Sequence, residues 1–251
     1  LFIKKLDNNY GKVLIIFSAI VFFSAIMLSG NRMPTLLFIM LIILTLVFNK
    51  NLRKFILPSI FLFTVIFYIF YKQDLTTRVY FNKFYTQVSN MIDPIIRQDF
   101  YNKKNPVYLK EFVSFYDTWL LNKYVGGGIK NFRYYCHKRD KIDKNSKFIC
   151  NMHPHNYYLE ILTETGLAGF LNITLIFILL IYITLYKRYF TNSLLVKNKI
   201  IIPFIFLFIV EIFPIKSTGS FFTTGSATYL FLIIAVLVGI TRQYNSIENK
   251  N

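Results

Sequence analysis

The feature that most constrains this chain is a series of apolar blocks separated by polar or basic segments. Of its 251 residues, 55% are hydrophobic, including 28 Phe and 18 Tyr. The apolar residues are concentrated in blocks and do not recur with a short period, which is typical of membrane proteins. The blocks are residues 13–28, 35–48, 55–71, 167–186, 200–213 and 227–240. They predict an all-α polytopic membrane protein with about six transmembrane helices.

Charged residues flank these blocks, and their balance is strongly basic, with a formal net charge of +17. In a soluble protein such an excess would favour a nucleic-acid partner. Beside apolar blocks it favours membrane lipids and phosphorylated lipids instead. We therefore expect no nucleic acid among the partners of this chain.

The positions of Lys and Arg predict the side of the membrane on which each segment lies. Short basic segments at 50–54 and 187–199 should remain in the cytoplasm, whereas a long loop is exported regardless of its charge. Three regions follow: three transmembrane helices in 1–71, a large extracytoplasmic loop with short helices in 72–166, and three transmembrane helices with a cytoplasmic tail in 167–251. Arg32 lies on the same side as the loop, which is the periplasm in a Gram-negative cell.

Three motifs lie between or beside the apolar blocks. In the first, residues 155–169, a His-Asn pair precedes Tyr-Leu, an acidic residue and Gly-Leu-x-Gly at the start of an apolar block. The second, residues 126–132, is a glycine turn that ends in Phe, and the third is the Ser-Gly-Asn-Arg segment 29–32. Together they resemble the O-antigen ligase and O-antigen polymerase superfamily. The third is similar to that family's Ser-Arg-Gly between two membrane helices, from which Asn31 and Met33 depart. Family members are typically longer, so we expect this chain to be the C-terminal portion of a protein.

The resemblance implies a fold like that of the C-type glycosyltransferases and transfer of a glycan from undecaprenyl pyrophosphate to an acceptor hydroxyl, without metal or cofactor. With the lipid A core as acceptor the enzyme is a ligase, and with another lipid-linked repeat unit it is a polymerase. The non-enzymatic alternative is a flippase for lipid-linked oligosaccharides, which is disfavoured because the charges are concentrated outside the apolar blocks. The implied enzyme is integral to the bacterial inner membrane, with its active site on the periplasmic side.

Within the first motif, His155 is the candidate catalytic residue. Histidine changes charge near neutral pH, and as a general base it would take the proton of the acceptor hydroxyl as this attacks the anomeric carbon. The alternative is a boundary histidine that caps a helix or donates to a carbonyl. Asn156 is predicted to be a helix cap, and Gly166 and Gly169 to permit close helix packing.

Basic residues outside the apolar blocks are candidates for binding the donor pyrophosphate, because guanidinium groups match phosphate oxygens in bidentate geometry. The candidates are Arg32 and Arg78 at the ends of predicted transmembrane helices, and Gly126, Gly128, Lys130 and Arg133 in and after the glycine turn. The glycines would bring backbone amides to a phosphate or simply form a flexible turn. An arginine that the family carries ahead of this turn has no clear counterpart here.

The two cysteines, Cys136 and Cys150, lie in the same exported loop. In an oxidising compartment they are predicted to form a structural disulfide. A zinc site made by both cysteines with His137 and His153 is the alternative, but the spacing matches no standard pattern, so no metal site is predicted. Glu211, inside the fifth apolar block, has no evident partner in the sequence.

Overall fold

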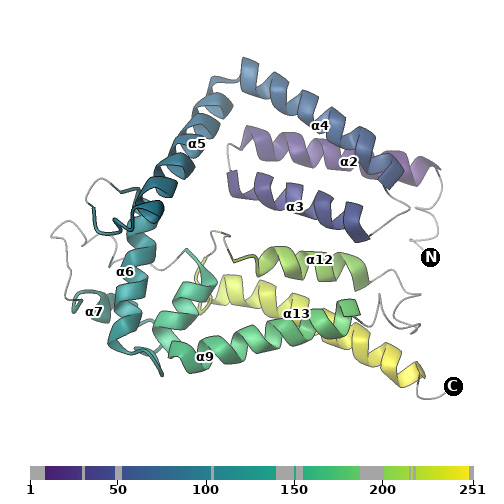
Figure 1. Cartoon of the computed structure of the whole chain (residues 1–251). Coiled ribbons are helices and arrows are strands. Elements are labelled where there is room, and N and C mark those ends of the chain that lie inside the picture. Colours follow the sequence, from purple (N-terminus) through teal and green to yellow (C-terminus); the bar gives the residue numbers. More distant parts are fainter. Residues whose placement is uncertain are drawn as a thin grey trace. The chain divides into compact units, whose positions relative to one another are not determined.

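The computed structural model describes residues 9–29, 32–48, 53–102, 105–139, 150, 155–186, 201–214, 216 and 219–248. Every regular element in these residues is a helix, which confirms the predicted all-α class (Figure 1). The chain divides into two compact units, Leu1–Ile92 and Asp93–Asn251, and the boundary falls inside helix α5 (Leu75–Ile96). Each unit has its own packed core.

The first unit contains three apolar helices, α2 (Asn9–Leu28), α3 (Arg32–Phe48) and α4 (Arg53–Gln73), and most of α5. The three apolar helices contact one another in every pairing. Their contact is centred on Phe23, Phe38 and Phe63, whose ring centroids lie 5.7, 4.8 and 5.6 Å apart. Tilted and edge-on rings at these distances add to the stabilisation that comes from burying their area.

A break at Asp74 separates α4 from α5. The carboxylate of Asp74 accepts a hydrogen bond from the backbone N–H of Thr77 at 2.6 Å and so caps α5. The guanidinium of Arg78 donates to the carbonyls of Tyr71 and Lys72 at 3.3 and 2.8 Å, which satisfies the C-terminal end of α4. The region predicted to be a loop from residue 72 therefore begins with a 22-residue helix.

The second unit contains α6 (Val107–Leu121), the short α7 (Phe132–Cys136), α9 (Tyr157–Ile181) with a π-helical turn after it (Tyr182–Tyr186), α12 (Ile201–Glu211) and α13 (Thr224–Glu248). Helix α6 packs against α7 and α9, and α12 packs against α13 and the π-helical turn. A buried cluster of Phe115, Phe132 and the two cysteines joins α6 to α7, and Leu159 of α9 packs against it.

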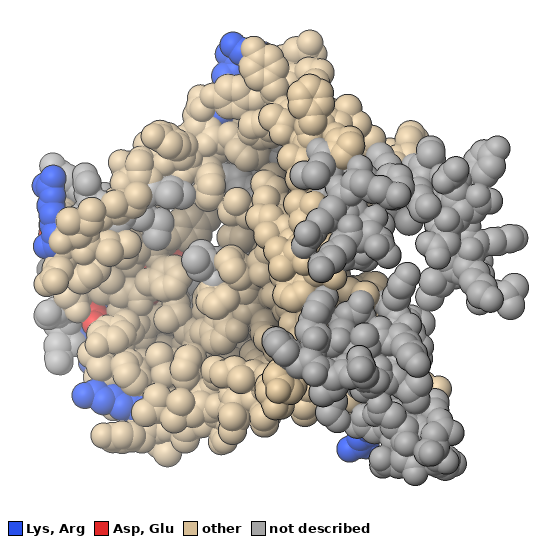
Figure 2. Space-filling model, turned by 45° about the vertical axis from the view of Figure 1, so that its right-hand side comes forward, with Lys and Arg blue, Asp and Glu red and all other residues tan. Residues whose placement is uncertain are grey.

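Two segments of the described chain are long and apolar enough to cross a membrane, Tyr157–Tyr186 and Thr224–Gln243. Four shorter apolar helical segments are Phe17–Ile26, Met33–Phe48, Ile60–Gln73 and Ile201–Glu211. These six segments follow the order of the six predicted transmembrane helices, and within the described residues two of the six meet both the length and the apolarity of a membrane crossing. On the face in Figure 2, uncharged residues cover most of the described surface, and Lys and Arg form small separate groups. Such a surface is compatible with lipid contact.

Candidate functional site

The candidate site is built around the N-terminus of α9, where the half-buried His155 directly precedes the helix. Asn156 is extended, and its Oδ1 accepts hydrogen bonds from the N–H groups of Tyr158 and Leu159 at 3.0 and 3.2 Å, which confirms the predicted cap. Its Nδ2 donates to the carbonyl of Pro214 at 2.5 Å. One residue therefore caps α9 and ties it to the α12–α13 connection (residues 212–214, 216 and 219–223 of the described chain). This fixes the backbone beside His155.

Glu211, for which the sequence suggested no partner, makes a second tie. The hydroxyl of Tyr157 donates to Glu211 Oε1 at 2.9 Å, and Glu211 Oε2 forms an ion pair with Lys216. The hydroxyl of Tyr158 donates to the carbonyl of Ile212 at 2.6 Å. A buried carboxylate is tolerated when it is paired and hydrogen-bonded, and both oxygens of Glu211 have partners. The end of α12 is thereby fastened to the first turn of α9.

Glu160 makes the third tie between α9 and the α12–α13 connection. Its side chain is 1% exposed and accepts hydrogen bonds from the Ser220 hydroxyl and the Phe221 N–H. The rings of Tyr157 and Phe221 meet edge to face with their centroids 5.5 Å apart. The acidic residue of the histidine motif is therefore a structural anchor.

Helix α9 is broken at Gly166, whose φ of 67° lies in the left-handed region. A break leaves backbone groups without intrahelical partners, and the glycine turn that follows α6 supplies them. Before the break, the carbonyls of Thr163 and Glu164 accept hydrogen bonds from the N–H groups of Gly127 and Gly128 at 3.0 and 2.9 Å. After the break, the N–H groups of Leu167 and Ala168 donate to the carbonyls of Lys123 and Tyr124 at 2.9 and 3.1 Å. The turn is therefore docked onto the break.

The docking requires glycine on both sides of the contact. A Cβ atom on Gly126 or on Gly166 would lie 2.4 Å from backbone atoms of the opposite segment. Gly166 thus permits close packing, as predicted, but against a turn. The amide of Gly126 donates to the carbonyl of Asn122 at 2.9 Å and that of Gly128 to Glu164, so both amides proposed as phosphate ligands are engaged within the protein.

Lys130 and Arg133 follow the docked turn, and both side chains are exposed. The backbone N–H of Lys130 hydrogen-bonds to the carboxylate of Glu164, an additional contact with α9. Both cations thus lie on a segment that is hydrogen-bonded to α9 next to its break at Gly166.

Glu111 of α6 is a residue that the sequence reasoning missed. Its side chain is 8% exposed. Burial raises the pKa of the Glu111 carboxyl, and attraction to His155 opposes part of this rise, so the two side chains lie within electrostatic reach of each other. The buried residues of α6 include Glu111, Ser114, Phe115 and Thr118, which have the spacing of one helix face. The signal in the sequence that could have identified Glu111 is its position as an acidic residue on the same helix face as Ser114, Phe115 and Thr118.

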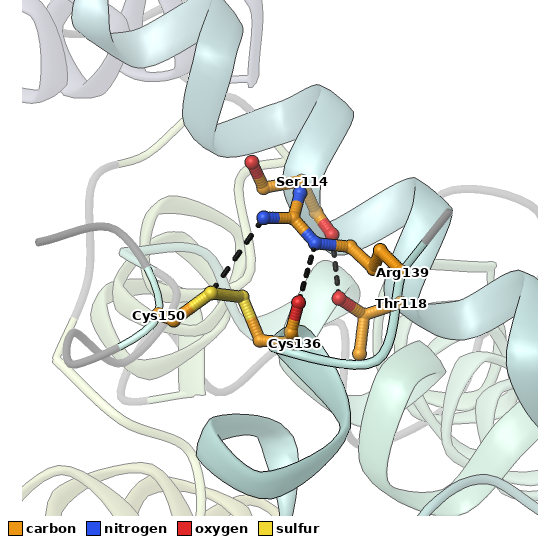
Figure 3. Close-up of a disulfide and its surroundings, with 5 residues drawn as sticks. All are labelled: Ser114, Thr118, Cys136, Arg139 and Cys150. Carbon is orange, nitrogen blue, oxygen red and sulfur yellow. Dashed lines mark hydrogen bonds between the residues drawn. A yellow bond between two sulfur atoms is a disulfide. The ribbon is translucent and has the colours of Figure 1, made fainter. Parts of the chain in front are cut away.

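In the structure, Cys136 and Cys150 are joined by a disulfide, with their Cα atoms 5.5 Å apart. Beside it lies Arg139, which is 5% exposed and was not singled out from the sequence. Its Nε donates to the Cys136 carbonyl at 2.8 Å, and its Nη2 lies 3.6 Å from Cys150 Sγ. The guanidinium of Arg139 therefore lies between the disulfide and the part of α6 that carries Ser114 and Thr118 (Figure 3). Burial lowers the pKa of Arg139, and attraction to Asp117 opposes this effect.

The zinc alternative required both thiolates, which the disulfide uses. Its fourth ligand, His153, lies outside the described residues. Among the residues that are described, no three His, Cys, Asp or Glu side chains are grouped so that they would hold a metal ion.

Of the three arginines proposed for pyrophosphate binding, Arg32 and Arg78 belong to the first unit, whereas Arg133 belongs to the second, as do His155 and Lys130. Arg32 is the first residue of α3, and its side chain is not among those described. Arg78 is exposed, and its guanidinium donates to the last carbonyls of α4. In this structure Arg78 therefore has a capping role.

Comparison with known proteins gives a family match. Residues 17–174, more than half of the chain, match the family model described as O-antigen ligase. The matched range contains the Ser29–Arg32 segment, the glycine turn, α6 and the histidine motif, and so includes residues of both units. Searches of the curated proteins and of the solved structures gave no match.

Proposed function

The chain belongs to the O-antigen ligase family, and on this premise we propose that it transfers a glycan from undecaprenyl pyrophosphate to a hydroxyl of the lipid A core. Family membership makes it a membrane glycosyltransferase of the ligase or polymerase type. The observation that carries the more specific proposal is the fixed position of His155. It immediately precedes a helix start that Asn156, Glu160 and Glu211 tie to the α12–α13 connection.

In the proposed reaction, His155 is the general base. The acceptor oxygen attacks the anomeric carbon and forms the new carbon–oxygen bond, while the bond from this carbon to the phosphate oxygen breaks. The pyrophosphate leaves with that electron pair, and the hydroxyl proton passes to the unprotonated ring nitrogen of His155. A direct displacement of this kind inverts the anomeric centre.

The leaving pyrophosphate gains negative charge, and fixed cations stabilise a transition state best where charge develops. We assign this role first to Lys130 and Arg133, because both are exposed on the segment that is docked onto α9. Arg32 and Arg78 are proposed as further phosphate ligands, and Arg78 would have to share its contacts with α4. Because these cations supply positive charge, the proposed reaction needs no metal.

For the glycine turn we propose a positioning role. The amides of Gly126 and Gly128 already donate to carbonyls of the protein, and the close approach to Gly166 sets where the following cations lie. The turn would then hold Lys130 and Arg133 beside the donor while its backbone remains bonded to α9.

The proposed site faces the periplasm, with the chain integral to the bacterial inner membrane. Two arguments support this placement. The positive-inside rule exports the region 72–166, and an apolar helix long enough to cross a membrane begins beside His155. The donor lipid and the lipid A core would then both be held in the outer leaflet, next to the base.

A polymerase of the same family is the second candidate, because the motifs do not separate the two acceptors. Lipopolysaccharide banding of a strain that lacks the gene distinguishes them. Polymer that remains on its lipid carrier and is missing from the core supports the ligase. Core that bears a single repeat unit contradicts the ligase and supports the polymerase. Loss of all external glycan intermediates contradicts both and supports a flippase.

A further inference from the structure

Helix α6 and the first turns of α9 lie side by side and run in the same direction (Figure 1). Just after the end of α6, the carbonyls of Lys123 and Tyr124 accept hydrogen bonds from the N–H groups of Leu167 and Ala168. Nearer to the N-termini of the two helices, Leu159 of α9 packs against the core cluster that contains Phe115 of α6. Phe115 and Leu159 have the same offset in the sequence as the two bonded pairs, so the packing of Leu159 on this cluster is in accordance with one register for the two segments.

The same offset, carried back by one further helical turn, brings Glu111 opposite His155. The attraction between these two side chains is in accordance with that register. Glu111 lies on the buried face of α6, one turn before Phe115. Its position is therefore set by the packing of α6 against α9.

We propose that Glu111 is a positioning residue for His155, which orients the imidazole and stabilises the imidazolium that forms when the ring takes the acceptor proton. The proposal rests on the proposed function of His155 as a general base. A carboxylate beside an imidazole favours its charged form and restrains its orientation. The proton taken from the hydroxyl stays on His155 until it is released to water, and the negative charge of Glu111 is unchanged through the cycle.

The other described carboxylates at this end of α9 have partners of their own. Glu160 accepts hydrogen bonds from Ser220 and Phe221 of the α12–α13 connection, and Glu211 is paired with Lys216 and with the hydroxyl of Tyr157. On α6, the titratable side chains within one helical turn of Glu111 are the half-buried Lys110 and the exposed Tyr108. Glu111 is thus the acidic group that this packing assigns to His155.

The first test is steady-state kinetics of the full chain in nanodiscs, with an undecaprenyl-pyrophosphate-linked oligosaccharide as donor and purified lipid A core as acceptor. Glu111→Gln should lower kcat by roughly tenfold to a hundredfold and leave both KM values within about twofold of the wild type. Glu111→Asp, which keeps the charge, should retain more activity than Glu111→Gln. A wild-type kcat for Glu111→Gln would overturn the proposal.

Asp99→Asn is the matched control, because Asp99 is an exposed acid of the same unit whose carboxylate accepts a hydrogen bond from Asn102 at 2.8 Å. It should keep the wild-type kcat. The double variant Glu111→Gln with His155→Ala should be no slower than His155→Ala alone, since a residue that acts through His155 loses its effect when the imidazole is removed. Independent, additive losses would contradict the positioning role.

The second test needs no turnover and is an NMR titration of protein labelled in its three histidine rings. The His155 resonance is the one that disappears in His155→Ala. Its titration midpoint should move to lower pH in Glu111→Gln and stay in place in Asp99→Asn. An unmoved midpoint in Glu111→Gln would overturn the inference even if His155→Ala is inactive, whereas full activity of His155→Ala would contradict the proposed function itself.

Discussion

Glu111, Glu160 and Glu211 are three buried carboxyl groups around one helix start, and their partners differ. Glu160 and Glu211 are held by donors of the α12–α13 connection or of α9, so both act as anchors. Glu111 lies within electrostatic reach of His155. Because an unpaired buried charge is costly, the partner of each carboxylate indicates its role.

A pH dependence of stability follows from the environment of Glu111. Burial raises its pKa above the ordinary value of 4.5, so the folded state holds this proton more tightly than the unfolded state. The resulting stability is present below 4.5 and is lost as pH rises through the raised pKa. Relative to the wild type, Glu111→Gln should therefore gain stability between acidic and neutral pH. Thermal unfolding across this range measures the difference, and a relative loss of stability in the variant as pH rises would contradict the account.

At the scale of elements, the break in α9 and the glycine turn after α6 form one hydrogen-bonded junction. The break exposes carbonyl and N–H groups, and the turn bonds them. This joins the end of α6 to the start of the apolar part of α9. The exposed cations that follow the turn are positioned by the same contact.

Gly166→Ala should disrupt this junction between the glycine turn and the break in α9. Its Cβ would lie 2.4 Å from backbone atoms of the turn, at a φ of 67°, so we expect a loss of at least about 3 kcal/mol in unfolding free energy together with loss of transfer. Gly239→Ala in α13 is the matched control, because a Cβ there meets nothing within 4 Å. It should be neutral or stabilising by up to about 1 kcal/mol. Equal melting temperatures of the two variants would contradict the proposed docking.

The disulfide should stabilise the segment between α7 and α9. Cys136 and Cys150 are separated by 14 positions in the sequence, and closing a loop of this size contributes about 3 kcal/mol. Replacing both cysteines by serine should lower the melting temperature, as should reduction of the wild type. Thiol labelling of unreduced, denatured protein checks the pairing directly. Two freely labelled cysteines, or labelling that only zinc suppresses, would contradict it.

Local signals in the sequence predicted the helical class and the Asn156 cap, because both depend on residues that are near one another along the chain. The contacts that build the site join distant segments. Glu211 has no partner in its own apolar block and finds Lys216 and Tyr157 only when α12 packs on α9. Glu111 likewise reaches His155 only through the register of α6 and α9, which no periodic pattern encodes.

At the scale of the whole molecule, the family match includes residues of both units. It extends from α2 to α9 and includes Arg32 of the first unit and His155 of the second. The apolar blocks correctly predicted the all-α class of the described residues, in which two helical segments are both long and apolar enough to cross a membrane. The break at Gly166 is not visible in the apolar pattern, because its backbone partners come from the turn after α6.

His155 is proposed as the base of the glycan transfer. The two other histidines of the chain serve as matched controls, His137 next to the disulfide-bonded Cys136, and His153, which Pro154 separates from the helix start. Each would be replaced by alanine in the full chain.

The decisive measurement is the rate at which each alanine variant, at equal membrane expression, transfers glycan from the undecaprenyl-pyrophosphate-linked donor to lipid A core. Loss of a general base costs about a hundredfold to ten-thousandfold in rate. We expect that loss for His155→Ala and near wild-type rates for His137→Ala and His153→Ala. A wild-type rate for a normally expressed His155→Ala protein would contradict the account, and selective loss with His153→Ala would move the base two residues upstream.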